Sequence, residues 1–259
     1  MSSEYDEVIR RYFKDLVSRS GLSSEYITAT SGGGGAATSG GVDFRIVPPE
    51  WFKLPSREYA IARGKEVIME CAFRGARAHV FTSSPFRGSL KLSEVLKLRL
   101  GSIAERAVFY GSLNAVMRYL GLVDKTVHCR GDEPVKCAGE LVKVVLSEYG
   151  NVPVLLVGYQ PAMARALAGE LRKLYITDMN PENVGKEVRG VRVLDHTKNL
   201  ELMEEVEVVL ATGSSVINST LWPIYDRAKE LGRELIVYGV SAAGAAKVLG
   251  IKRYCTYGK

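Results

Sequence analysis

Residues 152–161 read Val-Pro-Val-Leu-Leu-Val-Gly-Tyr-Gln-Pro, and this stretch decides the fold. The apolar run over residues 152–157 does not alternate with polar residues, which is typical of a strand covered on both faces in a parallel sheet. Pro161 suits the first turn of a helix, because proline lacks the N–H that this position leaves unpaired. The stretch therefore predicts a buried strand, a tight turn and a helix in succession.

The same succession continues to the end of the chain. We expect further strands over residues 174–177, 191–194, 207–211 and 234–238, and helices over residues 161–174, 217–231 and 242–249. Strands that alternate with helices build a parallel sheet sandwiched by helices. Residues 151–259 are therefore predicted to form a Rossmann-like α/β domain.

Residues 1–150 show a mixed pattern instead. We expect strands over residues 25–30, 42–47, 66–73 and 76–81, and helices over residues 4–20, 93–100, 103–120 and 139–149. Arg74 and Gly75 separate two of these strands and predict a hairpin. The run Ser31–Gly41, SGGGGAATSGG, is either a linker or a mobile loop over a ligand site. Residues 1–150 are therefore predicted to form an α+β domain.

The composition excludes several classes of protein. Hydrophobic residues make up 46% of the 259 residues, which is enough for a core and excludes general disorder. No stretch approaches roughly 18 consecutive apolar residues, and the start, MSSEYDEVIRRYF, is too polar for a signal peptide. We therefore expect a cytoplasmic protein without a membrane partner.

The net charge and the number of cysteines exclude further functional classes. The 35 basic and 29 acidic residues give a net charge of +6, but they are interspersed, so the sequence does not indicate nucleic-acid binding. Four cysteines in a chain of this length favour thiols or metal ligands over disulfides. The sequence leaves open whether the protein forms a homo-oligomer.

Two candidate binding residues follow the first two strands of the predicted parallel sheet, where ligands of such sheets bind. Gly158 is either part of a tight turn or part of a phosphate cradle. Asp178 follows twenty residues later, where an acidic side chain can accept hydrogen bonds from ribose hydroxyls. The alternative is that Asp178 caps the turn over residues 178–181.

The loop over residues 211–220 has the strongest binding pattern. Thr212, Gly213, Ser214, Ser215 and Asn218 lie between a predicted buried strand and a helix. Small hydroxyl residues and glycine at such a place leave donors free to converge on an anion. The alternative is a simple N-cap by one of the two serines.

Residues 128–137 form a second candidate cluster, with His128, Cys129 and Cys137 as metal ligands. We expect a loop, because Gly131 and Pro134 interrupt a helix. The two cysteines are eight residues apart, unlike the close pairs of structural zinc sites. The cluster therefore predicts either a weakly bound transition metal or zinc, or a loop with reduced cysteines.

Several of these motifs together resemble the archaeal branch of the family called "putative heavy-metal chelation". The motifs are Ser112–Val116, His128-Cys129 with Asp132–Pro134 and Cys137, Gly158–Pro161, Thr177–Pro181, Thr212–Ser215 with Asn218 and Thr220, and Tyr238–Val240 with Ala243–Ala246.

The resemblance implies a fold and a set of site residues. It implies an N-terminal domain like the amino-terminal domain of enolase, a C-terminal Rossmann-like domain and a ligand cleft between them. The site residues that it implies are Asn114, His128, Thr212, Gly213, Ser214 and Asn218.

The sequence thus favours binding of a small anionic or metal-chelating molecule in an interdomain cleft, with a role in heavy-metal or chelator handling. The alternative is a transferase-type enzyme that holds a nucleotide-like cofactor, adenosylmethionine or a dinucleotide, on Gly158 and Asp178. The sequence leaves open whether the protein is an enzyme.

Overall fold

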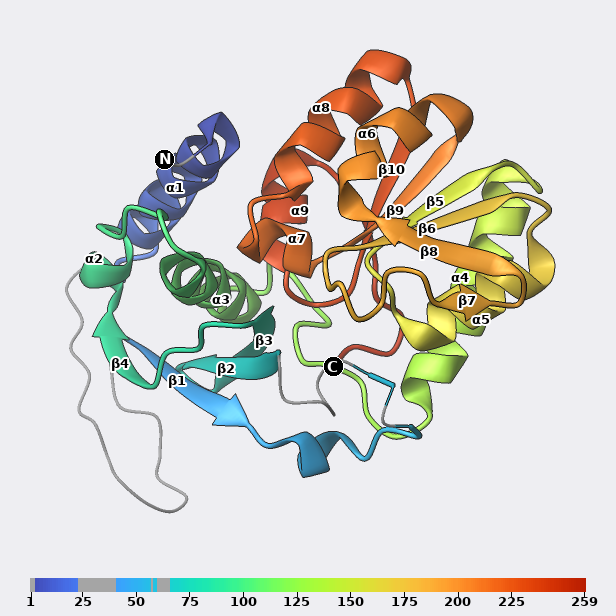
Figure 1. Ribbon diagram of the computed structural model, residues 1–259. Coiled ribbons are helices and arrows are strands. Elements are labelled where there is room, and N and C mark those ends of the chain that lie inside the picture. Colours follow the sequence, from blue (N-terminus) through green and yellow to red (C-terminus); the bar gives the residue numbers. More distant parts are fainter. Residues whose placement is uncertain (1–2, 23–40, 57, 60–65) are drawn as a thin grey trace.

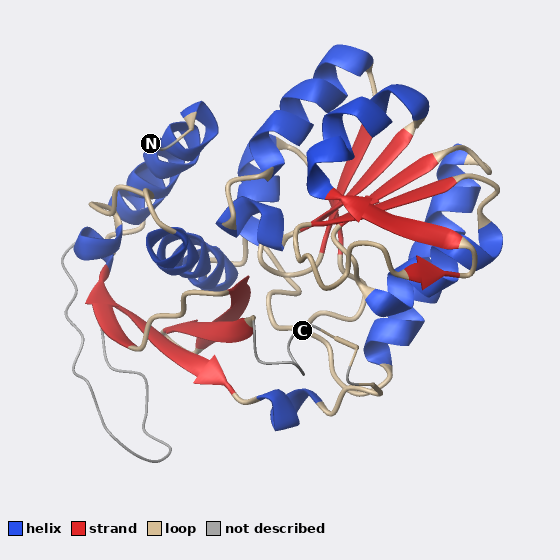
Figure 2. Cartoon of the chain, viewed as in Figure 1, coloured by secondary structure: helices blue, strands red, loops and turns tan. Residues whose placement is uncertain are grey.

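The computed structural model describes residues 3–22, 41–56, 58–59 and 66–259. Within these residues the chain forms an antiparallel sheet of four strands and a sheet of seven strands that is parallel except at one edge. Figure 2 shows the two sheets in different parts of the molecule, with helices beside both. The predicted mixed α/β fold is confirmed.

The small sheet has the strand order β3-β2-β1-β4. Its strands are β1 (Gly41–Val47), β2 (Val67–Phe73), β3 (Ala76–Thr82) and β4 (Gly88–Lys91). Arg74 and Gly75 both have positive φ values, 48° and 84°, and join β2 to β3 in a two-residue turn. Such a turn matches the twist of paired strands, so the predicted hairpin is confirmed.

Three helices accompany the small sheet: α1 (Glu4–Arg19), α2 (Leu92–Val95) and α3 (Ile103–Tyr119). α1 begins with a capping box between Ser3 and Asp6. α3 packs on β2 and β3 and is buried along most of its length. The predicted helix over residues 93–100 is wrong in extent, because it stops at Val95 after one turn.

The large sheet has the strand order β11-β10-β9-β5-β6-β8-β7. Its strands are β5 (Val154–Val157), β6 (Leu174–Asp178), β7 (Glu187–Val188), β8 (Val191–Asp195), β9 (Val208–Thr212), β10 (Glu234–Tyr238) and β11 (Lys252–Tyr254). Its helices are α4 (Glu133–Tyr149), α5 (Pro161–Glu170), α6 (Asn199–Leu202), α7 (Ser214–Ile217), α8 (Leu221–Leu231) and α9 (Ala243–Leu249). Short 3-10 turns lie at Pro49–Phe52, His196–Lys198 and Met203–Glu205.

Both faces of the large sheet are buried, as the apolar strands predict. In β5, Val154 and Leu156 pack with residues of α4 and α5, whereas Leu155 and Val157 belong to the cluster that also contains α3. Figure 1 shows α4 and α5 on one side of the sheet and α8 and α9 on the other. The α4 helix therefore covers the large sheet, although it precedes β5 in the chain.

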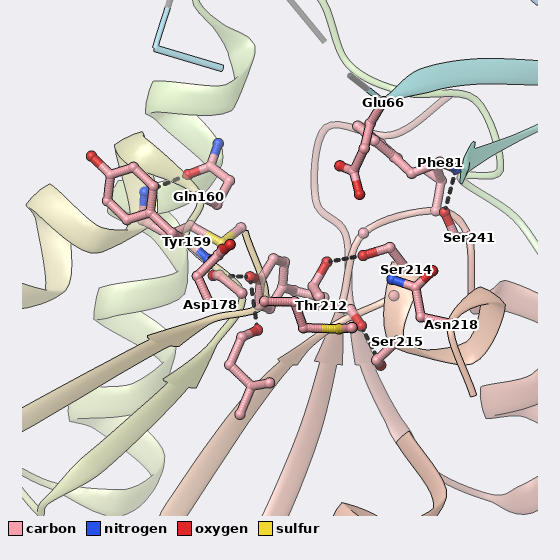
Figure 3. Close-up of a pocket in the computed structure, with 18 of the residues that line it drawn as sticks. Glu66, Phe81, Tyr159, Gln160, Asp178, Thr212, Ser214, Ser215, Asn218 and Ser241 are labelled. Atoms are coloured by element: carbon pink, nitrogen blue, oxygen red, sulfur yellow. Dashed lines mark hydrogen bonds between the residues drawn. The ribbon is translucent and has the colours of Figure 1, made fainter. Parts of the chain in front are cut away.

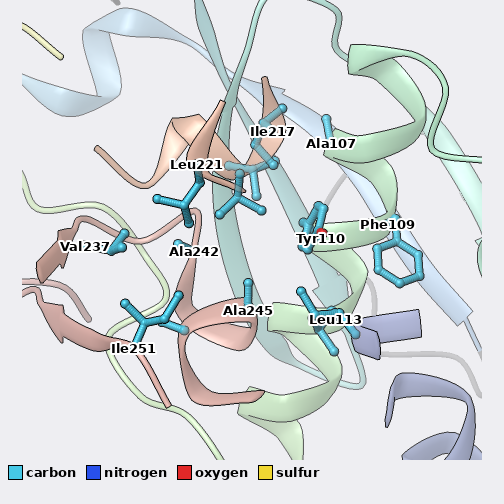
Figure 4. Close-up of a cluster of buried hydrophobic side chains, with 14 of the residues drawn as sticks. Ala107, Phe109, Tyr110, Leu113, Ile217, Leu221, Val237, Ala242, Ala245 and Ile251 are labelled. Carbon is cyan, nitrogen blue, oxygen red and sulfur yellow. The ribbon is translucent and has the colours of Figure 1, made fainter. Parts of the chain in front are cut away.

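The two sheets share one hydrophobic cluster, which α3 joins to the helices of the large sheet (Figure 4). Tyr110 and Leu113 of α3 are fully buried beside Leu221, Ala242 and Ala245. Full burial of a side chain as large as leucine stabilises by about 1.5–3 kcal/mol. The small sheet is therefore held in a fixed position against the large one.

Two further predicted helices differ from the structure in extent. The helix expected over residues 217–231 is divided into α7 and α8, because Ser219 has a left-handed φ of 61°. The helix expected over residues 161–174 ends at Glu170.

The predicted loop over residues 128–137 is wrong in its second half. α4 already begins at Glu133, and Pro134 lies in its first turn, where no N–H is needed. Cys137 is therefore a helical residue.

The predicted strand over residues 25–30 and nearly all of the glycine-rich run Ser31–Gly41 lie outside the described residues; Gly41 itself begins β1. No helix in the described ranges combines the length and the apolar character that crossing a bilayer requires.

Candidate functional site

A cavity of about 460 Å³ lies at the carboxyl ends of β5, β6, β9 and β10 (Figure 3). Further wall residues come from β3, from the residues next to β2, and from residues 128–137 and 254–258. Small-molecule sites span about 300–1,000 Å³. Of the predicted site residues, ten line the cavity: His128, Cys129, Cys137, Gly158, Asp178, Thr212, Gly213, Ser214, Ser215 and Asn218.

Gly158 lies where β5 turns toward α5. Its φ is +93°, and a Cβ there would lie 2.7 Å from Thr212 Cγ2. The Tyr238 hydroxyl donates a 2.7 Å hydrogen bond to the Gly158 carbonyl. The glycine is therefore required by the close packing of β5, β9 and β10, which forms the floor of the cavity.

Asp178 ties two strand ends together. Its Oδ2 accepts from the Tyr159 N–H at 2.6 Å, and its Oδ1 accepts from the Asn180 N–H at 2.7 Å. The second bond is the turn cap that the sequence offered as an alternative. Asp178 thus fixes the loops after β5 and β6 while it also lines the cavity.

The loop after β9 is built by hydrogen bonds among its own residues. The Ser215 hydroxyl donates to the Thr212 carbonyl at 2.5 Å, and the Thr212 and Ser214 hydroxyl oxygens lie 3.1 Å apart. The N-cap of α7 is Gly213, and no side chain caps it, so the predicted serine N-cap is wrong. The Asn218 amide has no hydrogen-bond partner among the described residues, and Figure 3 shows it beside Ser214.

Gly213 serves packing more than ligand approach. A Cβ at this position would lie 3.1 Å from the Tyr238 oxygen and 3.1 Å from the Ala242 nitrogen, both backbone atoms. The Gly213 N–H also donates to that Tyr238 oxygen at 2.8 Å. The groups that this loop offers to a ligand are therefore the Ser214 hydroxyl and the Asn218 amide.

Asn114 does not line the cavity, which corrects the expected site. It is fully buried on α3, where its Nδ2 donates to the Ser241 carbonyl at 2.8 Å and its Oδ1 accepts from the Gly244 N–H at 2.7 Å. The amide is therefore used to hold the loop between β10 and α9. Ser241 on that loop does line the cavity and accepts from the Phe81 N–H at 3.0 Å.

His128 lies at the end of a buried polar chain. Glu70, which is 3% exposed, accepts hydrogen bonds from Arg45, Arg77 and His79. Burial alone would raise the Glu70 pKa, but these three bonds outweigh it and lower the pKa to about 2. The other nitrogen of His79, Nδ1, accepts from the backbone N–H of His128 at 3.2 Å.

The ring of His128 is neutral near pH 7. Burial lowers its pKa to about 4, although the hydrogen bond to the Cys129 carbonyl works in the opposite direction. Nδ1 lies 2.7 Å from that carbonyl, which assigns the proton to Nδ1. Nε2 therefore keeps a lone pair that can accept a hydrogen bond or bind a metal ion.

Sequence reasoning missed Glu66 and Tyr59. Burial and the charge of Asp178 raise the pKa of Glu66, and Figure 3 shows its carboxyl group directed into the space above the sheet. The Tyr59 hydroxyl is buried and has no hydrogen-bond partner among the described residues. Neither residue belongs to a motif, so only the three-dimensional structure brings them to the cavity wall.

The expected metal ligands reach the cavity without forming a preformed metal site. His128, Cys129 and Cys137 all line it, together with Cys255, which the sequence did not suggest. Among the residues that the structure describes, no three His, Cys, Asp or Glu side chains are arranged to hold a metal ion.

The charge of the wall does not fit the expected anion. The described lining residues include the acids Glu66 and Asp178 but neither lysine nor arginine. Carboxylates attract cations and repel anions across a partly buried cavity. The described wall is thus acidic, and its other side-chain functional groups are hydroxyls, amides, thiols and imidazoles.

Fold and cavity together define an α/β protein with a small-molecule-sized site at the carboxyl edge of a mostly parallel sheet. A model of the family DUF364, described as "Putative heavy-metal chelation", matches residues 140–252. The resemblance drawn from the sequence motifs is therefore confirmed over that range.

Solved structures of that family are similar to this chain. A protein of unknown function from Pyrococcus horikoshii aligns over 91% of this chain and 78% of its own, with 16% identity and a TM-score of 0.51. A protein of unknown function from Desulfitobacterium hafniense aligns over 71% of this chain and 72% of its own, with 14% identity and a TM-score of 0.47. No curated protein matches the chain. At these identities the first likeness supports the fold alone.

Proposed function

We propose that this protein binds a small metal-chelating molecule, together with its metal ion, in the cavity, and so takes part in heavy-metal handling. The observation that carries the proposal is the wall itself, which has Glu66 and Asp178 and neither lysine nor arginine among its described residues. An acidic wall favours a ligand with positive charge. The name of the family matched by residues 140–252 agrees with this class of ligand.

The described residues contain no group of three side chains arranged to hold a metal ion, and this supports a chelate over a bare ion. A metal ion with fewer than three protein ligands has coordination positions left over, which a second molecule can fill. His128 Nε2 and the Glu66 carboxyl group are suited to contact such a complex, because neither has a hydrogen-bond partner among the described residues. The Ser214 hydroxyl and the Asn218 amide would bind the organic part.

We also propose that the chain has two domains with this cavity between them. The predicted boundary near residue 150 separates α4 from the sheet that it covers. Because α4 packs against α5, we place the boundary before Glu133. The likeness of the two parts to the enolase N-terminal domain and to Rossmann-like domains remains a prediction.

A pair of inert cobalt(III) complexes tests the charge preference. Tris(ethylenediamine)cobalt(III) is cationic and cobalt(III)–EDTA is anionic, and neither exchanges ligands during a calorimetric titration. We expect the cation to bind and the anion not to bind. Glu66→Gln should weaken cation binding about tenfold, equivalent to about 1.4 kcal/mol, because one of two facing carboxylates is lost.

The matched control is Glu187→Gln, which removes an exposed carboxylate on β7 that does not line the cavity. Its binding should equal that of the unchanged protein. Tighter binding of the anionic complex, or equal effects of the two substitutions, would overturn the proposal.

The alternative of a nucleotide-like cofactor has weaker support. Both oxygens of Asp178 already accept backbone hydrogen bonds, from Tyr159 and Asn180. The carboxylate is therefore less available to a pair of ribose hydroxyls. Adenosylmethionine in the same titration tests this alternative, and tight binding that is lost in Asp178→Asn would favour it.

A further inference from the structure

Glu70 and His79 form a buried polar pair within the small sheet. They are cross-strand neighbours on β2 and β3 and are 3% and 0% exposed. His79 Nε2 lies 3.0 Å from a Glu70 oxygen, and His79 Nδ1 lies 3.2 Å from the backbone nitrogen of His128. A backbone N–H can only donate, so Nδ1 is an acceptor and the ring proton is on Nε2. The two hydrogen bonds thus fix one tautomer of His79.

The same strand holds the segment that carries His128. The backbone N–H of His79 donates to the Thr126 carbonyl at 2.8 Å, and the Thr126 hydroxyl donates to the Arg77 carbonyl at 2.6 Å. The bond from the His128 N–H to His79 Nδ1 is the next contact along this segment. Of these contacts, only the bond at Nδ1 depends on a side chain of β3, and Glu70 orients that side chain.

The ring of His128 is held by its own neighbours. Its Nδ1 donates to the Cys129 carbonyl at 2.7 Å, and the rings of Phe52 and Phe81 lie edge-on to it, with centroids 5.6 and 5.2 Å away. Phe52 is fully buried, and Phe81 lines the cavity (Figure 3). Because Nδ1 carries the proton, Nε2 is the nitrogen that offers an acceptor to the cavity.

We propose that Glu70 and His79 are positioning residues, which hold His128 so that its Nε2 accepts a hydrogen bond from an N–H donor of the ligand. The inference rests on the proposed function and specifies the chelator as an amine that keeps N–H groups when it binds its metal ion. Glu66 and Asp178 favour the positive charge of such a complex, and an acceptor without a proton selects a donor. A chelator made of carboxylates offers no such donor.

Nitrogen NMR of the histidine rings tests the tautomers on the unchanged protein. The chain has three histidines, so single substitutions assign the signals. We expect the proton of His79 on Nε2 and that of His128 on Nδ1. Tris(ethylenediamine)cobalt(III), which is diamagnetic and has N–H donors, should shift the Nε2 signal of His128, whereas cobalt(III)–EDTA should not. A proton on Nδ1 of His79 or on Nε2 of His128 would overturn the inference.

Two substitutions of His79 separate its two hydrogen bonds. The amide oxygen of asparagine can occupy the place of Nδ1, and the amide nitrogen of glutamine can occupy the place of Nε2. His79→Asn therefore keeps the acceptor for the His128 N–H, whereas His79→Gln keeps the donor to Glu70. In calorimetric titrations we expect His79→Gln to bind the cationic complex about tenfold more weakly, and His79→Asn to restore most of this loss.

A double-variant cycle shows whether His79 acts through His128. His128→Phe removes Nε2 and should weaken binding about tenfold by itself. In the His128→Phe protein, His79→Gln should cause no further loss, because no acceptor is left to position. The matched control is Thr126→Val, which removes the bond to Arg77 and should lower Tm without the tenfold loss of affinity. Losses that multiply in the double variant, or equal losses in the two His79 variants, would overturn the inference.

The two proposals fail separately. If the cationic complex binds and depends on Glu66 but the losses at His79 and His128 multiply, the positioning role is wrong and the cavity proposal stands. If the complex does not bind although NMR shows the expected tautomers, the cavity proposal is wrong, and the inference about the ligand is wrong with it.

Discussion

Removing the carboxylate of Asp6 should destabilise the protein strongly, because it leaves a buried arginine without its counter-ion. Asp6 on α1 and Arg106 on α3 are 0% and 3% exposed and form two hydrogen bonds of 2.7 and 2.9 Å. The Tyr110 hydroxyl donates to the same carboxylate. Arg106 also donates to the carbonyls of Val216 and Ile217 in α7. The pair thus connects α1, α3 and the loop that carries the site.

Breaking a buried ion pair from one side costs about 3–5 kcal/mol, because the remaining charge stays buried. We therefore expect Asp6→Ala to lower the free energy of unfolding by that amount and Tm by about 10 °C. Urea titration followed by circular dichroism measures the first, and calorimetry measures the second. Asp15→Ala is the control on the same helix, since its pair with Arg19 is exposed and contributes less than about 0.5 kcal/mol.

The pH dependence of the same pair gives an independent check. Burial alone would raise the pKa of Asp6, but hydrogen bonds from Arg106 and Tyr110 outweigh it and lower the pKa. Because the pKa of Asp6 is lower in the folded state, the carboxylate stabilises the fold at pH values above its pKa in the unfolded chain. This stabilisation is lost as the pH falls through its pKa in the folded protein. A loss below about 1 kcal/mol in Asp6→Ala, or an equal loss in Asp15→Ala, would refute the reasoning.

Three further predictions follow from the fold and the site. Gly213→Ala should lower the free energy of unfolding, measured by urea titration, by about 1–3 kcal/mol, because its Cβ would lie 3.1 Å from the Ala242 nitrogen. An unchanged urea midpoint would mean that the loop shifts to make room for the methyl group. The pKa of Glu70 falls from 4.5 to about 2, so its contribution to stability is complete above pH 4.5 and lost toward pH 2. Glu70→Gln should remove the fall in the free energy of unfolding between pH 4.5 and pH 2. If the variant keeps this fall, other groups cause the pH dependence. Residues 133–259 should unfold cooperatively on their own and residues 151–259 should not, because the shorter fragment lacks α4; thermal scans that show the reverse would contradict the boundary.

The elements that the sequence predicted well are those with a local pattern. The strands β5, β9 and β10 were identifiable because a doubly covered strand contains a continuous apolar run, here residues 154–157, 208–211 and 235–238. The hairpin was identifiable because Arg74 and Gly75 fit a two-residue turn. The start of α4 is not predicted, because proline interrupts a helix at most positions, whereas the first turn of a helix accepts Pro134.

The site was only partly predictable, because several of its residues depend on contacts far apart in sequence. Cys255 reaches the wall through the pairing of the C-terminal tail with Val127, which no local pattern indicates. Glu66 resembles an ordinary polar residue before a strand until Asp178 and the sheet edge surround it. For Asn114 the error runs the other way. The family resemblance implies a ligand-binding residue, whereas in the structure its amide forms hydrogen bonds within the protein, to Ser241 and Gly244.

The contacts that fix the cavity wall come largely from residues that cannot touch a ligand. Arg106 holds α7, Asn114 holds the loop after β10, and Lys259 holds the tail that carries Cys255. Each of these contacts joins two segments that are far apart in the chain, and at least one of the two carries residues that line the cavity. Substitutions at these positions should therefore change ligand binding and stability together, whereas substitutions at Glu66 or Asn218 should change binding with little effect on stability.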